Sequence, residues 1–335
     1  MFDTPVPVEF VRALRELGLS DASSLSGTPL TGGVSSDIWC IETDKGLVCA
    51  KRALPKLRVA ADWKAPVERN LYEARWLQVA NTAAPGCAPE LLAQHAELGV
   101  LVMRYLPPAD YRLWKQELHA GRALETTAQA VGEVLARIHS YAAKQDGLAA
   151  QFPTQKIFFE IRLAPYLLAT AQRHPDLASA LNALVLQTQS HAKTLVHGDV
   201  SPKNILLGSQ GPVLLDAECA TWSDPAFDLA FCLNHFLLKC LWMPATRADF
   251  LHCFEAFAAS YLVGVDWESR QQLEARAARL LPGLFLARVD GKSPVEYITD
   301  DAQREQVRRV ASAFLLKPSS QLQDIAQAWA KELHT

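Results

Sequence analysis

A polar loop between two short apolar runs is the feature that most limits how this chain can fold. Residues 194–218 read TLVHGDVSPKNILLGSQGPVLLDAE, in which strand-like pieces flank the segment HGDVSPKN and a Gly-Ser-Gln-Gly turn follows. The sequence around this island is mostly helical in pattern, so a small sheet embedded among helices is expected. Loops on a rigid scaffold commonly carry reactive groups, which makes HGDVSPKN the candidate site.

The first third of the chain has the pattern of strands with one helix. Residues 37–43 and 46–53 fit a pleated surface and are joined by an Asp-Lys-Gly break, which predicts a hairpin. A helical recurrence follows over 67–81, and two further apolar runs end at a Pro-Pro pair at 107–108. We therefore expect a strand-rich lobe over residues 1–105 and a mainly helical lobe over 106–335.

Composition narrows the class of protein. The 335 residues, 50% hydrophobic and 21% charged, are enough for two packed lobes. A formal net charge of −3 offers no basic excess, so nucleic acid is not expected as a partner. No apolar stretch suits a bilayer and no secretion signal is found, so we expect no membrane association and a cytoplasmic location. Seven scattered cysteines indicate buried, reduced thiols.

Three polar side chains of the island suit one kind of chemistry. Asp199 and Asn204 are five residues apart, and Asp216 follows at the end of the next hairpin. Oxygen ligands of this type suit Mg²⁺, which takes one or two protein carboxylates and leaves its other positions to water and phosphates. The remaining carboxylate can accept a proton from a hydroxyl group. This division of roles is typical of phosphoryl transfer.

The motifs HGDVSPKN, LLDAE (214–218) and DPAFDLA (224–230) resemble the aminoglycoside phosphotransferase and choline kinase family, whose members are relatives of protein kinases. The resemblance covers most of the chain and implies a protein-kinase-like, bilobal α+β fold. It implies a catalytic role for Asp199 and Mg²⁺ coordination by Asn204 and Asp216. It also implies that Asp228 braces the catalytic loop and that His197 is structural.

The strand-rich lobe supplies candidate nucleotide-binding residues. The segment LTGGVSSDIW (30–39) resembles the loop that covers the nucleotide in this family, although a Gly-Gly turn is also typical of an ordinary hairpin. Lys51 occupies the place of the strand lysine that contacts the nucleotide phosphates. The predicted nucleotide-binding set is Gly32, Gly33, Ser35, Ser36, Lys51, Glu73 and Met103.

Lys51 needs a carboxylate partner, and the following helix offers two. Glu68 and Glu73 are about 140° apart around a helix of 3.6 residues per turn, so only one of them can face Lys51. Glu73 adjoins the apolar stripe of the helix, whereas Glu68 lies in a charged cluster near its start, where it would favour the helix dipole. We therefore assign the partner role to Glu73.

The sequence departs from the family pattern at one position of the loop. Many relatives have a small residue before the loop asparagine, but this chain has Lys203. A cation there could offset charge on the transferring phosphoryl group, so Lys203 is assigned to the catalytic set. A surface lysine is the alternative.

The acceptor site is expected in the helical lobe. Candidate residues come from the segments FFEIRLAPY (158–166) and FLARVDGKSPVEYI (285–298) and from the end of the LLDAE motif: Arg162, Tyr166, Glu218, Arg288 and Asp290. Core packing also explains the first segment. In the second, Ser293, Pro294 and Glu296 form a capping-box pattern that predicts a helix start with solvated charges, and the alternative is a rim that recognises the hydroxyl groups of the acceptor. Glu218 is equally well explained as a group near the metal or as a solvated carboxylate.

These observations predict a small-molecule kinase that transfers the γ-phosphoryl group of ATP, or GTP, to a hydroxyl group of a small polar metabolite or an aminoglycoside-like compound. From residue 260 onward the chain has ten acidic and ten basic residues, which disfavours a polycationic acceptor. The alternative is a catalytically silent, nucleotide-binding regulatory module of the same fold. Protein phosphorylation ranks lowest, because the Gly-rich and activation-segment motifs are missing.

Overall fold

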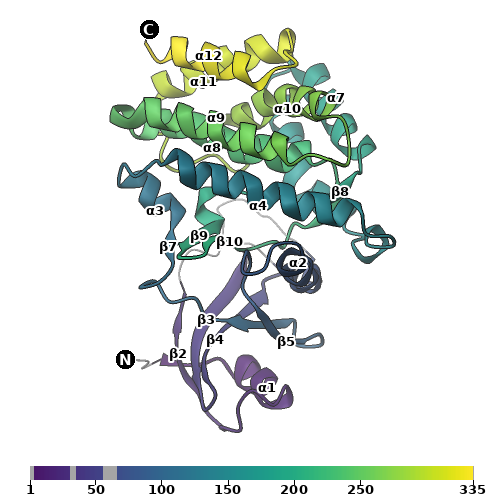
Figure 1. The fold of residues 1–335 in the computed structure, drawn as a ribbon, viewed down its shortest axis with the longest axis vertical. Helices are drawn as coiled ribbons and strands as arrows, with labels where there is room; N and C mark the ends of the chain where they lie inside the picture. The colour runs from purple at the N-terminus through teal and green to yellow at the C-terminus, as the bar shows by residue number, and fades with distance from the viewer. Residues whose placement is uncertain (1–3, 31–34, 56–65, 335) are drawn as a thin grey trace.

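The computed structural model describes residues 4–30, 35–55 and 66–334. A strand-rich part lies at one end of the molecule and a larger helical part at the other (Figure 1). This arrangement confirms the expected α+β architecture.

The strand-rich part is a six-stranded antiparallel sheet. Its strands, in spatial order, are β1 (Thr4–Pro5), β2 (Ser26–Pro29), β3 (Ser36–Thr43), β4 (Gly46–Ala53), β6 (Val100–Arg104) and β5 (Leu91–His95). The predicted hairpin is the pair β3–β4. Two helices pack on the sheet, α1 (Val8–Glu16) and α2 (Arg69–Ala83).

Strand alternation decides what each face of the sheet contacts. Val100 and Val102 of β6 pack in a small core with α1, whereas Leu101 and Met103 join the large core that continues into the helical part. Cys49 on β4 pairs with Met103 across the sheet and packs against the same large core. The face that carries odd-numbered residues of β4 therefore points toward the helical part, and Lys51 lies on it.

The helical part is built around α4 and α8, which run across the middle of the molecule (Figure 1). Its α-helices are α3 (Trp114–His119), α4 (Glu125–Ala143), α5 (Gln155–Phe158), α6 (Ala169–Arg173), α7 (Ala178–Ser190), α8 (Ala226–Trp242), α9 (Arg247–Val263), α10 (Arg270–Asp290), α11 (Asp301–Leu316) and α12 (Leu322–Glu332). A π-helix, η2 (Phe159–Leu168), continues α5, and short 3₁₀ turns are η1 (Ala149–Gln151), η3 (Pro202–Asn204) and η4 (Pro244–Thr246).

The island of residues 194–218 forms the expected strands. β9 (Ile205–Gly208) and β10 (Gly211–Leu214) make a hairpin, to which β7 (Arg112–Leu113) adds a third strand. β8 (Thr194–Val196) pairs with β11 (Thr221–Ser223). The polar loop therefore leaves β8 and returns through η3 into β9, held by a strand at each end.

One local prediction is wrong. No helix starts at Ser293, because α10 ends at Asp290 and the next helix begins at Asp301 with Asp300 as its N-cap. The Ser293 carbonyl and hydroxyl oxygens both accept hydrogen bonds from Arg288 Nη1. The serine is therefore engaged by a neighbouring guanidinium group, in a segment that forms no helix.

The cysteines agree with the expectation of free thiols, since all seven are unpaired and six are buried, with Cys49 half-buried. In the part of the chain that the structure describes, no helix has the length and apolar character needed to cross a membrane.

Candidate active site

Asp228 holds the start of the polar loop. It lies fully buried in the first turn of α8, and its two carboxylate oxygens accept hydrogen bonds from His197 N at 2.6 Å and Gly198 N at 2.8 Å. Gly198 has φ of +78°, and a Cβ there would come within 2.8 Å of Cys219. The glycine is therefore required for the tight turn that Asp228 fixes.

His197 joins the loop to the segment after β10. Its Nδ1 accepts from Asp199 N at 3.1 Å, so Nε2 carries the hydrogen and donates to the Leu215 carbonyl oxygen at 3.0 Å. Burial lowers the pKa of His197, which favours this neutral form. Trp76 of α2 packs edge-on against the ring. The contacts explain a structural histidine without any role as a nucleophile or ligand.

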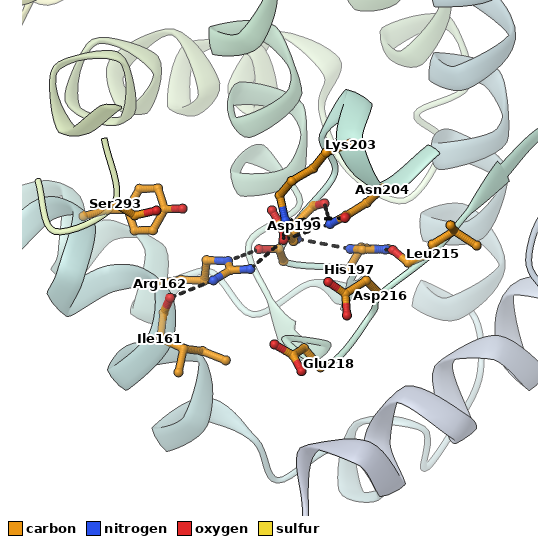
Figure 2. A network of polar contacts seen from close by, with 12 residues as sticks. Ile161, Arg162, His197, Asp199, Lys203, Asn204, Leu215, Asp216, Glu218 and Ser293 are labelled. Carbon is orange, nitrogen blue, oxygen red and sulfur yellow. Dashed lines mark hydrogen bonds and ion pairs between the residues drawn. The ribbon is translucent and has the colours of Figure 1, made fainter. Parts of the chain in front are cut away.

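Three side chains converge on one oxygen of Asp199 (Figure 2). Its Oδ2 lies 2.9 Å from Arg162 Nη2, 3.0 Å from Lys203 Nζ and 2.9 Å from Asn204 Nδ2. Burial alone would raise the pKa of Asp199, but Lys203 and Arg162 outweigh it and hold the pKa below its ordinary value. No described residue hydrogen-bonds Oδ1, so that oxygen is available to a hydroxyl group.

The amide of Asn204 is oriented by the same loop. Its Nδ2 donates to the Asp199 carbonyl oxygen at 3.1 Å as well as to the Asp199 carboxylate. This leaves Asn204 Oδ1 as the outward acceptor, with Lys203 Nζ at 3.4 Å. The asparagine therefore presents an oxygen, as a metal ligand must.

Asp216 has a strained backbone. It is the one non-glycine residue with positive φ, +66°, in the described part of the chain. Such strain is maintained only where surrounding contacts demand it, and it is concentrated at functional sites. Asp216 Oδ1 contacts Lys51 Nζ, and burial, which would raise the pKa of Asp216, is outweighed by Lys51 and Lys203, which lower it.

Lys51 lies between two carboxylates. Its Nζ is 2.8 Å from Glu73 Oε1 and 2.7 Å from Glu73 Oε2, in addition to the Asp216 contact. Burial would lower the pKa of Lys51, but Asp216 and Glu73 outweigh it, so the ammonium stays charged. The structure thus confirms Glu73 as the partner of Lys51. Glu68 is exposed at the start of α2.

The donor set suits a hard cation such as Mg²⁺. Among the described residues, no group of three His, Cys, Asp or Glu side chains could hold a metal on its own. Asn204 and Asp216 supply two oxygen donors beside the loop (Figure 2), and an ion that takes its remaining ligands from water and phosphates needs no more.

The remaining nucleotide-binding predictions divide into two groups. Gly32 and Gly33 lie outside the described residues. Ser35 and Ser36 are buried at the start of β3, and the Ser36 hydroxyl has no hydrogen-bond partner within the described chain. Met103 faces the helical part beside Cys49.

Arg69 is a residue that sequence analysis missed. It is fully buried in the first turn of α2 and donates to the carbonyl oxygens of Ser35 at 2.6 Å, Leu54 at 2.8 Å and Pro66 at 2.7 Å. Its Nε lies 3.0 Å from Glu218 Oε2. Glu218 is therefore neither solvated nor free, because it joins the segment after Asp216 to α2.

The acceptor candidates are separated by the fold. Arg162 reaches Asp199, and its Nε also donates to the Gly198 carbonyl oxygen at 2.6 Å. Arg288 Nη1 is 3.2 Å from the Tyr166 hydroxyl. Asp290, by contrast, is engaged by Arg308 at 2.7 Å and by His174 at 2.8 Å. In this segment Arg288 and Asp290 are buried, whereas Lys292 and Glu296 are exposed, so the expected solvated charges are found at two of the four positions.

Comparison with known proteins decides the family. A model described as the phosphotransferase enzyme family matches residues 26–273. The chain belongs to this family. The loop HGDVSPKN, Asp216 and Asp228 all lie within the matched residues.

Individual relatives are distant. The chain is 26% identical to a methylthioribose kinase of Cronobacter sakazakii over 221 residues, which cover 57% of this chain and 54% of the relative. It therefore spans about half the length of the curated relatives it matches.

Two solved structures share the fold. One is a choline/ethanolamine kinase family protein from Mesorhizobium loti, with a TM-score of 0.52, 16% identity and coverage of 98% of this chain and 100% of that one. The other is the amicoumacin kinase hAmiN in complex with AMP-PNP, Ca²⁺ and Ami, with a TM-score of 0.56, 13% identity and coverage of 90% and 91%. These likenesses confirm the protein-kinase-like fold.

Proposed function

We propose that this chain is a small-molecule kinase that transfers the γ-phosphoryl group of ATP to a hydroxyl group of a small acceptor. The observation that carries the proposal is the convergence of Asp199, Asn204 and Asp216 from two loops, next to a buried Lys51–Glu73 pair. An oxygen-rich metal site, a free carboxylate oxygen and a fixed cation are the parts that phosphoryl transfer needs. Membership of the phosphotransferase family supports the same chemistry.

Residues 1–105 serve as the nucleotide-binding lobe in this proposal, and residues 106–335 carry the catalytic loop and the acceptor site. Lys51, fixed by Glu73, contacts the nucleotide phosphates. Ser35, Ser36 and Met103 lie on the nucleotide side, with ATP as the expected donor and GTP as the alternative to be compared. Bound Mg²⁺, held by Asn204 and Asp216, would neutralise charge on the phosphates.

Asp199 acts on the acceptor. Its Oδ2 is saturated by Arg162, Lys203 and Asn204, so the oxygen that meets the hydroxyl is Oδ1. The low pKa of Asp199 makes it a weak base, which suits a loose transition state in which the hydroxyl is oriented first and loses its proton late. Lys203 then lies where it can offset charge as the phosphoryl group moves.

The test is a product-mass screen with Mg·ATP and Mg·GTP against amino alcohols, sugars, methylthioribose, aminoglycosides, hydroxy acids and sugar phosphates. We expect a phosphorylated product from at least one acceptor class. Asp199→Asn is expected to lower kcat by about 10³-fold while Mg·ATP affinity stays within about twofold of the parent, and its melting temperature verifies that the variant is folded.

Two results would reject the proposal. Full activity of Asp199→Asn would contradict the proposed role of the Asp199 carboxylate. Tight Mg·ATP binding without a product from any class would instead favour the silent regulatory module.

A further inference from the structure

One face of α8 leads away from the catalytic loop and carries an unusual set of residues. Phe231, His235, Lys239 and Trp242 follow one another at spacings of four, four and three, so they share a single stripe. The same helix starts at the loop, where Asp228 binds His197 and Gly198. Each four-residue step advances about 6 Å along the helix, so the stripe begins at the site and extends outward from it.

Arg162 connects Asp199 to this stripe. While its Nη2 contacts Asp199, its guanidinium carbon lies 5.9 Å from the ring centroid of Phe231 and 5.9 Å from that of Tyr166. Arg288 lies over the same Tyr166 ring at 5.6 Å. A row of cations and aromatic rings therefore runs without a break from Asp199 to Arg288.

Lys239 is buried without a carboxylate partner among the described residues. Only 1% of it is exposed, and its Nζ lies 4.7 Å from the ring centroid of Trp242 and 5.0 Å from that of Tyr297. Burial and the neighbouring Lys115 lower the pKa of Lys239 to about 7. The aromatic pair is thus already occupied by a cation of the chain itself, which leaves no place for a cationic ligand group.

The electrostatic surroundings of His235 are cationic. Burial lowers its pKa, and so do the four charges that act on it most strongly, which belong to Arg288, Lys239, Lys203 and Lys115. The nearby carboxylates are engaged elsewhere, since Glu296 contacts Lys115 and Asp290 contacts Arg308 and His174. Three buried polar atoms of this region have no hydrogen-bond partner within the described chain: His235 Nε2, Arg288 Nε and Tyr297 Oη.

We propose that the phosphate acceptor carries, besides its reactive hydroxyl group, a compact anionic group, a carboxylate or a phosphate ester, which binds against Lys239, Arg288 and His235. The inference rests on the proposed kinase function and names its substrate class. An unpaired buried ammonium destabilises the folded protein, and an anion would supply both the missing charge and the missing hydrogen-bond acceptors. A neutral sugar such as methylthioribose would leave both cations unpaired.

The experiment measures binding, so it does not depend on turnover. Calorimetry on the full-length protein saturated with Mg·ADP compares two matched series: glycerol, glycerate and glycerol 3-phosphate; ribose, ribonate and ribose 5-phosphate. We expect at least one anionic member to bind about tenfold or more tightly than its neutral parent. The carboxylate and phosphate members show which of the two anions the site prefers.

Lys239→Met tests the location. Methionine has a similar length and no charge, so the variant should fold, which its melting temperature verifies, and the tenfold preference for the anion should disappear while Mg·ADP affinity stays unchanged. His235→Gln provides a second, milder variant that should reduce the preference about threefold. Lys317→Met, which removes an exposed lysine between α11 and α12, is the control.

Equal affinity for neutral and anionic members in both series would overturn the inference. So would an anion preference that survives in Lys239→Met, because the anion would then bind at the nucleotide-phosphate position. Failure of the kinase proposal looks different: anion binding would persist, but no acceptor would be phosphorylated by Mg·ATP.

Discussion

Buried charges are paired on the phosphate side of the candidate site and unpaired on the acceptor side. On the phosphate side, Lys51 lies between Glu73 and Asp216, and Arg69 contacts Glu218. On the acceptor side, where we propose that the phosphate acceptor binds, Lys239 and Arg288 are buried among aromatic rings, and neither has an ion-pair partner in the described part of the chain. The buried charges of the phosphate side are therefore neutralised within the protein. The buried cations of the acceptor side destabilise the folded protein, and a ligand of opposite charge would remove this destabilisation.

The largest expected effect comes from breaking the phosphate side. Lys51→Met removes the cation that separates two buried carboxylates, so we expect kcat/KM for Mg·ATP to fall about 10²–10³-fold. Glu73→Gln should cost less, because Lys51 keeps its contact with Asp216. Steady-state kinetics at saturating acceptor checks both. A loss below tenfold in Lys51→Met would show that this pair is only structural.

A second prediction concerns stability on the same side. Glu218→Ala deprives the buried Arg69 of its contact with this carboxylate, so unfolding in denaturant should require about 2–3 kcal/mol less free energy. Glu90→Ala is the matched control, because its partner Arg104 is exposed and the pair should contribute under about 0.5 kcal/mol. Equal losses in the two variants would contradict the distinction between buried and exposed pairs.

The acceptor side should respond in the opposite direction. Lys239→Met removes an unpaired buried charge, so we expect the ligand-free protein to gain about 2 kcal/mol of stability at pH 6. The pKa of Lys239 is lowered to about 7, so between pH 7 and 10.5 the unfolded chain binds more protons than the folded one. Raising the pH therefore stabilises the parent protein relative to the variant.

Denaturant unfolding at pH 6, 8 and 9.5 measures this difference. The gain from Lys239→Met should shrink steadily as the pH rises. A gain that is constant across the three pH values would mean that Lys239 does not titrate in this range.

The smallest effect should come from Lys203, which connects the two sides. Its side chain is about half exposed and contacts Asp199 at 3.0 Å. Because Lys203 helps to lower the pKa of Asp199, Lys203→Ala should raise that pKa and reduce kcat about threefold at pH 8 and more at pH 5. A pH–rate profile checks the change in the acid limb. An unchanged kcat would show that Lys203 is a surface lysine without a role in catalysis.

The spacing of residues within short stretches of the sequence predicted much of the candidate site. The loop motif places Asp199 and Asn204 within one tight turn, and the hairpin length fixes where Asp216 emerges. Helix geometry showed that only one of Glu68 and Glu73 can face Lys51, and the apolar stripe beside Glu73 decided between them. Each of these inferences depends on residues that are neighbours in the chain or joined by one regular element.

Contacts between segments that are far apart in the sequence could not be predicted from spacing. Arg69 and Glu218 are 149 residues apart, and the arginine looked like part of a charged helix start. Arg162 reaches Asp199 from a π-helix, whose altered spacing no hydrophobic periodicity reveals. The capping pattern at Ser293 failed for a local reason, because Arg288, five residues earlier in the chain, donates a hydrogen bond to the Ser293 hydroxyl and no helix begins there.

The sequence by itself determined the α+β fold, the family and the motif residues of the catalytic loop, since these follow from short-range patterns that any fold of this type must satisfy. Only the tertiary structure decided which buried charges are paired. Pairing depends on which segments meet in space. It affects stability strongly for buried charges, because a charge removed from water needs a partner from the protein or from a ligand.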